Sequence, residues 1–258
     1  MPPGITGTTA LVGLFVLTHL GLGQPPLRDA VADRIGSVRF TVLYALLAWG
    51  SLGALLYRYM VERAHGPPGL GLAGIPWVHI TAMVLMGLGM VLMVTILAPS
   101  GYLRSAAVVF GTHTRAPRGM ERVTRHPFFV GLTLSCIGHI LIAPRLAGVI
   151  VFGGFGLLAM LGGPLQDRKL RARRGQPHAD YLAATSIVPF VAVLRGRQTI
   201  VAAELPWVFV LLGIPSAWVA YRVHGTGLGP WLVMGVLVVA PLWFAVASAF
   251  RHHRARSQ

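Results

Sequence analysis

Residues 127–165 read PFFVGLTLSCIGHILIAPRLAGVIVFGGFGLLAMLGGPL, and this stretch decides the fold. It holds two apolar runs, 127–143 and 146–165, and only Ala143-Pro-Arg145 separates them. About 20 helical residues cross the hydrocarbon core of a bilayer, because each residue of a helix adds about 1.5 Å. Lipid offers the backbone no hydrogen bonds, so a spanning run has to be helical. The stretch therefore predicts two spanning helices joined by a tight turn.

The same pattern extends over the rest of the chain. Of its 258 residues, 55% are hydrophobic and 11% are charged, and the mean hydropathy is +0.68. This composition argues against a disordered, a nucleic-acid-binding or an ordinary cytosolic protein. We predict an all-α, polytopic membrane bundle that forms a single transmembrane domain, 1–258, with about seven spans: 5–23, 39–60, 75–98, 127–143, 146–165, 205–223 and 230–250.

The basic residues predict the orientation of these spans. The net charge is +15, but the charges fall between apolar runs, which points to membrane lipid rather than nucleic acid as their partner. Of the 22 Lys and Arg residues, 18 lie in the loops after odd-numbered spans or in the C-terminal tail, and 4 lie in the other loops. The positive-inside rule then places the N-terminus outside and the C-terminus in the cytoplasm. All but Lys169 are Arg, which indicates a GC-rich genome and predicts the inner membrane of a bacterium.

Two polar segments follow the fifth span. Residues 166–182 read QDRKLRARRGQPHADYL, which predicts a basic helix that runs out of the span, a Gly-Pro turn and a short second helix. Residues 185–194 are apolar but too short to cross a bilayer. We expect this stretch to lie in the interface or to re-enter the membrane.

Ionisable side chains within apolar spans are unfavourable unless they are used, so His19, His79, Cys136 and His139 are candidate site residues. Cys136 and His139 are three residues apart and therefore share one helix face. Together with a histidine from another span they could hold a metal. Packing roles are equally consistent with these residues, since a buried histidine often bonds a neighbouring helix and a lone cysteine behaves as a small apolar residue.

A polar corner precedes the fourth span. Pro127 marks the first turn of that helix, and Arg125 and His126 stand directly before it. Helix N-terminal amides beside two basic side chains favour an anion, for which a lipid headgroup is one candidate. The alternative is that both residues only contact the headgroup layer.

Several blocks of sequence resemble the NnrU family and its relative, the 15-cis-zeta-carotene isomerase family, over roughly residues 15–200. Around an NnrU-like core of about 5–200, the two spans within 205–250 are additional. The blocks are His19-Leu-Gly-Leu22, Leu27-Arg-Asp29, Gly74-Ile-Pro-Trp-Val-His79, Val123-Thr-Arg-His-Pro127 with Gly131, Cys136-Ile-Gly-His139, Asp167-Arg-Lys-Leu170, Thr185-Ser-Ile-Val-Pro-Phe190 and Gly196-Arg-Gln198.

The resemblance implies a non-covalent haem b and the isomerisation of a cis double bond in a lipophilic, carotenoid-like polyene. It places the iron ligands at His19 and His139, with Cys136 as an alternative ligand, and makes a haem propionate the second candidate for the anion at Arg125 and His126. A second pair of iron ligands also stays open. At about 1.5 Å per helical residue, His19 lies about 6 Å and His139 about 18 Å from the cytoplasmic boundary of the membrane. Ligands of one iron should lie at similar depth. His79, about 6 Å from the outer boundary, is thus an alternative partner for His139.

Two further functions remain open. The chain also resembles, more distantly, the isoprenylcysteine and phospholipid methyltransferases, which use S-adenosylmethionine. Those enzymes usually carry two glutamates where this chain has Gln166-Asp167. The third function is that of a non-enzymatic NnrU-type membrane protein linked to nitrogen-oxide metabolism. The sequence does not specify the substrate or the oligomeric state.

The orientation can be tested with reporter fusions at residues 115 and 175. Both fusions should report the cytoplasm, because both residues lie in loops that hold most of the basic side chains. Reports from opposite sides of the membrane would contradict the predicted topology.

Overall fold

The computed structural model describes residues 3–95 and 116–224, and every named element in these ranges is helical, which confirms the all-α prediction. The elements are α1 (Pro3–Gly21), α2 (Pro25–Ile35), α3 (Ser37–Glu62), α4 (Pro76–Val94), α6 (Met120–Val123), α7 (Pro127–Ile142), α8 (Leu146–Arg174), α9 (Gln176–Ala184), α10 (Val191–Leu194), the 3₁₀ turn η2 (Ala202–Glu204) and α11 (Trp207–His224).

Six of the seven predicted spans are helices. Among the described residues, α3, α4 and α8 are each long and apolar enough to cross a membrane, and α1 with α2 qualifies only as a pair bent by 83°. The apolar helices α7 and α11 are shorter. The seventh predicted span, 230–250, and most of the loop at 99–126 lie outside the described residues. Seven spans and the orientation therefore stay predictions.

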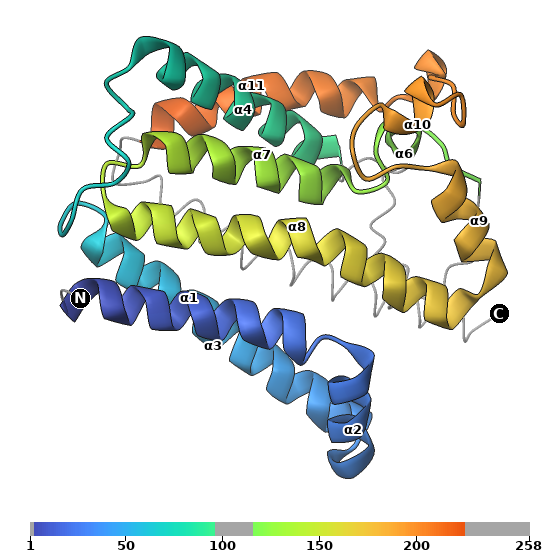
Figure 1. Cartoon of the computed structure of the whole chain (residues 1–258), viewed down its shortest axis with the longest axis horizontal. Coiled ribbons are helices and arrows are strands. Elements are labelled where there is room, and N and C mark those ends of the chain that lie inside the picture. The colour runs from blue at the N-terminus through green and yellow to red at the C-terminus, as the bar shows by residue number, and fades with distance from the viewer. Residues whose placement is uncertain (1–2, 96–115, 225–258) are drawn as a thin grey trace.

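The hairpin of α7 and α8 lies at the centre of the bundle (Figure 1). Helix α8 packs on α1 on one side and on α7 on the other. Helix α4 lies along α7, α11 lies along α4, and α3 packs on α1. This order places α8 between α1 and α7.

The tight turn predicted between α7 and α8 is confirmed. Ala143-Pro-Arg145 is the whole connection, and the loop before α4 forms backbone hydrogen bonds with this turn and the first residue of α8. The Gly69 amide donates to the Pro144 carbonyl (3.1 Å), and the Leu146 amide donates to the Pro67 carbonyl (2.9 Å). A side chain at position 69 would collide with the Ala143 carbonyl, so this approach requires glycine.

Small residues bring α4 and α7 into backbone contact. A Cβ atom on Gly131 would lie 2.6 Å from the Gly89 carbonyl oxygen, and one on Gly138 would lie 2.8 Å from the Ala82 carbonyl oxygen. Lipid gives no hydrophobic drive between apolar helices, so close packing at small residues is a main source of their association. The α4–α7 pair is therefore held by surfaces that have no room for a further methyl group.

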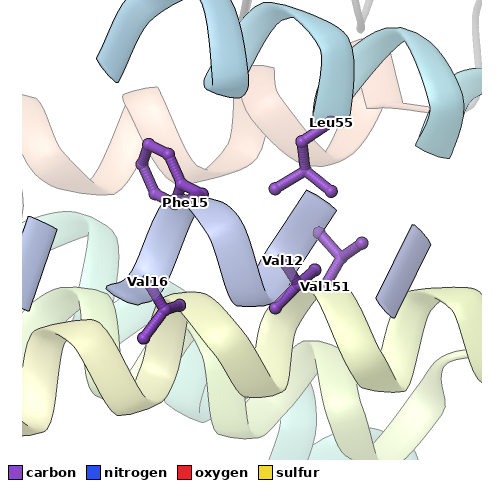
Figure 2. Close-up of a cluster of buried hydrophobic side chains, with 5 residues drawn as sticks. All are labelled: Val12, Phe15, Val16, Leu55 and Val151. Atoms are coloured by element: carbon purple, nitrogen blue, oxygen red, sulfur yellow. The ribbon is translucent and has the colours of Figure 1, made fainter. Parts of the chain in front are cut away.

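A second buried cluster joins α1, α3 and α8. Val12, Phe15, Val16, Leu55 and Val151 form it, as Figure 2 shows. The Thr8 hydroxyl donates to Glu62, which also pairs with Arg58, so a polar contact closes the α1–α3 interface at one end. Outward-facing side chains remain apolar, for example Leu17, which is 72% exposed. Helices that are apolar on their exposed faces fit a lipid environment.

Packing between α4 and α7 can be tested with a matched pair of glycines on α4. In Gly89→Ala the new methyl group would lie 2.5 Å from the Gly131 carbonyl oxygen, whereas no atom of the described residues lies within 4 Å of a methyl group at position 87. Overpacking of this kind costs about 1–3 kcal/mol. Thermal unfolding in detergent should show a midpoint several degrees lower for Gly89→Ala and an unchanged midpoint for Gly87→Ala. Equal midpoints for the two variants would contradict the contact.

Candidate functional site

The polar corner before α7 is built around the carboxylate of Asp167. Arg125 Nε donates to one carboxylate oxygen (2.7 Å), and His126 Nε2 lies 3.0 Å from the other. Asp167 and His126 are buried, with 5% and 4% of their surface exposed. Asp167 reaches this corner because α8 continues past its apolar part to Arg174, as the sequence predicted. The anion that Arg125 and His126 hold is thus a side chain of the protein itself.

The stretch 185–190 folds over this corner. The Arg125 guanidinium donates to the Thr185 carbonyl (3.1 Å), and the Arg125 amide donates to the Ser186 carbonyl (2.9 Å). Next to them the Thr124 hydroxyl donates to the Ile187 carbonyl (2.6 Å). The segment that we expected at the interface is therefore fixed by backbone groups to the start of α7.

A second ion pair, which the sequence analysis did not single out, holds the connection to α11. Arg122 donates through Nε (2.8 Å) and Nη2 (3.1 Å) to the two carboxylate oxygens of Glu204, and through Nη1 to Gln198 (2.9 Å). The Gly119 amide also donates to Glu204 (2.9 Å). The bonds from Arg122 and then from Gly119 lower the pKa of Glu204 from 4.5 to about 2. Glu204 is therefore ionised at neutral pH.

Cys136 and His139 share one face of α7, as their spacing predicted, and this face contacts α8. Cys136 is 2% exposed, and its Cβ atom lies 3.3 Å from where a Cβ atom of Gly156 would be. The His139 ring stacks on Phe152 with the centroids 4.2 Å apart. Both candidate ligands thus face an interior seam between two helices.

His19 lies on α1, half-buried against Phe15, with the ring centroids 4.2 Å apart. It shares one feature with His139. Each ring places Nδ1 within hydrogen-bond distance of the carbonyl four residues earlier, 2.9 Å to Phe15 for His19 and 2.7 Å to Ser135 for His139. A neutral imidazole that donates from Nδ1 carries no proton on Nε2, which is the form that binds a metal.

The two histidines nevertheless lie on different sides of α8. Gly154 faces α1, where Val12 contacts it, and Gly156 faces Cys136 on α7. Two residues correspond to about 200° around a helix, so these are opposite faces. The two histidines are also offset along α8. His139 lies beside Phe152, whereas α1 runs from Val16, beside Gly154, towards Gly23, beside Lys169. His19 therefore lies about 10 Å closer to the Lys169 end of α8 than His139 does. In this arrangement His19 and His139 do not fit as the two axial ligands of one haem.

His79, the alternative partner, is exposed on α4. Helix α4 contacts α7 instead through Ala82 and Gly89. Across residues 3–95 and 116–224, no group of three His, Cys, Asp or Glu side chains is placed to hold a metal ion. The offset between His19 and His139 along α8 agrees with the different helix positions that the sequence indicated, and the choice of iron ligands stays a prediction.

Comparison with known proteins gives a family and two relatives. The family model described as "NnrU protein" matches residues 8–232. The chain is 30% identical over 194 residues to the 15-cis-zeta-carotene isomerase of Arabidopsis thaliana, covering 74% of this chain and 51% of that protein. It is 27% identical over 189 residues to the isomerase of the same name from Zea mays, covering 72% and 50%. No solved structure gave a significant match.

The chain therefore spans about half the length of the curated relatives it matches. Both relatives are named as chloroplastic proteins, so they give no support to the predicted bacterial inner membrane. The apolar helices do support association with a membrane.

The corner can be tested by removing its charge. Asp167→Asn leaves Arg125 and His126 beside a neutral, buried partner, and loss of one member of a buried pair costs about 3–5 kcal/mol. Thermal unfolding in detergent should therefore begin many degrees lower. Asp180→Asn is the control, because Asp180 is exposed and contacts only the Gln176 amide among the bonds described. A similar midpoint for both variants would contradict the role of Asp167.

Proposed function

The chain belongs to the NnrU family, and from this premise we propose that it is a membrane isomerase acting on a cis double bond of a carotenoid-like polyene. The observation that carries the proposal is its 30% identity, over 74% of the chain, to a protein named 15-cis-zeta-carotene isomerase. The fold is compatible with such a substrate. A polyene partitions into the bilayer and reaches the protein from the lipid, where α1, α3 and α4 present apolar side chains.

The residues of the α7–α8 seam favour an uncharged substrate. His139 of α7 stacks on Phe152 of α8 with the ring centroids 4.2 Å apart, and Tyr59 of α3 lies edge-on to Phe152 at 5.9 Å. Aromatic faces pack well against a conjugated chain. Cys136 adds a small, buried side chain one turn away. These groups would position a polyene and exclude water from it.

Haem b enters the proposal from the family resemblance. The support within the chain is the ligand-ready form of His139 and His19 and the presence of Cys136 one turn from His139. The described arrangement does not bring the two histidines to one iron, because α8 lies between them. The isomerase proposal therefore rests on the family, and the haem is tested separately.

A second function stays a candidate. The family model that matches residues 8–232 is described only as "NnrU protein", which suits a non-enzymatic NnrU-type membrane protein as well. A methyltransferase is less favoured, because Arg125 and His126, the corner that such an enzyme would use for its cofactor, are engaged by Asp167.

Isomerisation is tested in the dark in a bacterium engineered to accumulate 15-cis-zeta-carotene. Expression of the full chain should convert the 15-cis form, and liquid chromatography measures the isomer ratio. Immunoblotting of the membrane fraction provides the control for expression. An unchanged ratio with the protein present in the membrane would favour the non-enzymatic function.

The haem is tested by the absorption spectrum of protein purified after expression with ample haem. We expect a haem b band in the wild type, its loss in His139→Ala and its retention in the exposed-site variant His79→Ala. Cys136→Ala and His19→Ala show whether either side chain ligates the same iron. A wild type that isomerises the polyene without a haem band would keep the isomerase and reject the cofactor.

A further inference from the structure

The bend between α1 and α2 brings together side chains from three helices, α2, α3 and α8. Lys169 of α8 donates through Nζ to the Gly23 carbonyl (2.9 Å), which lies in the bend. The Tyr44 hydroxyl of α3 is 3.6 Å from where a Cβ atom of Gly23 would be. Two of the sequence blocks noted above, 27–29 and 167–170, thus meet here, although about 140 residues separate them.

Positive charge exceeds negative charge at this point. Arg28 of α2 and Arg173, one turn beyond Lys169 on α8, both act electrostatically on Lys169. The carboxylate that acts on it is Asp29, which is 3.2 Å from Arg28 and mostly exposed. Lys169 has three N–H donors and, within the described chain, gives one of them to Gly23. The cluster of Arg28, Lys169 and Arg173 therefore retains donors and a net positive charge.

The end of the apolar part of α8 indicates that the cluster lies at the level of the bilayer headgroups. The apolar part of α8 ends at Leu165, four residues before Lys169. Helix α2 turns 83° away from α1 and has no buried residue, as in a helix that lies along the membrane surface. The Arg28 guanidinium lies 5.7 Å from the centroid of the Phe40 ring, which stacks on Tyr44. Tyrosine side chains such as Tyr44 are enriched at the membrane interface.

We propose that Arg28, Lys169 and Arg173 bind the phosphate of an anionic phospholipid headgroup at the α1–α2 bend. Lysine supplies a point charge and arginine a planar fork, and both suit phosphate oxygens. Basic pockets between membrane helices near the headgroup layer take anionic lipids. Exposed apolar side chains on the adjoining helices, such as Leu17 and Leu43, give the acyl chains a surface beside the headgroup. The site is independent of the isomerase proposal.

The test compares lipid protection of the full chain in detergent micelles. Phosphatidylglycerol should raise the thermal midpoint of the wild type, and phosphatidylcholine should not. Lys169→Gln keeps a donor for Gly23 but loses the charge, and should need about tenfold more phosphatidylglycerol for the same shift. The control is Arg171→Gln, the same change of charge at an exposed position on another face of α8, which should behave as the wild type. An equal loss in the control would overturn the site.

A second pair of variants keeps the test decisive if Lys169→Gln fails to fold. Arg28→Gln on α2 should also need about tenfold more lipid, and Arg34→Gln, exposed on the same helix, should not. Inorganic phosphate and glycerol phosphate distinguish the source of the anion. Protection by either at the concentration that suffices for phosphatidylglycerol would overturn the lipid as the occupant.

Discussion

Helix α8 packs on two opposite faces, and this constraint sets the rest of the arrangement. Gly154 admits the side chains of α1 on one face, and Gly156 admits Cys136 of α7 on the other. Without side chains at these positions both neighbours approach closely, which is how helices gain packing energy in lipid. Helix α4 then covers α7, and α11 covers α4. The layers seen in Figure 1 follow from this double contact of α8.

The starts, ends and turns of the helices could be predicted from the sequence. Which helices lie next to each other in the bundle could not. Pro127 marked the start of α7, Ala143-Pro-Arg145 marked the turn, and Gly175 marked the end of the basic helix, because each of these limits the backbone itself. Which helices are neighbours depends on small residues that face one another across an interface. An apolar span has similar side chains on every face, so its sequence does not indicate which helix packs against which face.

The difference between local and long-range contacts also explains which site residues were predicted and which were missed. Cys136 and His139 were assigned to one face because a spacing of three is a property of a single helix. The partners of Arg125 and Arg122 were missed, because Asp167 and Glu204 are distant in sequence. A signal was present nonetheless. The chain has only seven acidic residues against 22 basic ones, so each carboxylate near an apolar span was a candidate partner for a buried arginine.

His19 and His139, the iron ligands that the family resemblance implies, make the same hydrogen bond to the preceding turn of their helix but have different surroundings. His139 faces Phe152, whose ring leads on to Tyr59, so a molecule beside it meets apolar and aromatic groups. His19 faces Tyr44, and beyond it lies the bend where Lys169 contacts Gly23. An uncharged polyene suits the first environment, since it needs no polar partner. An amphiphile with an anionic end suits the second, because its charge would lie among cations while its chain stays in lipid. The separation imposed by α8 therefore gives the two histidines different surroundings, and the two proposed ligands, a polyene and an anionic lipid, fit one surrounding each.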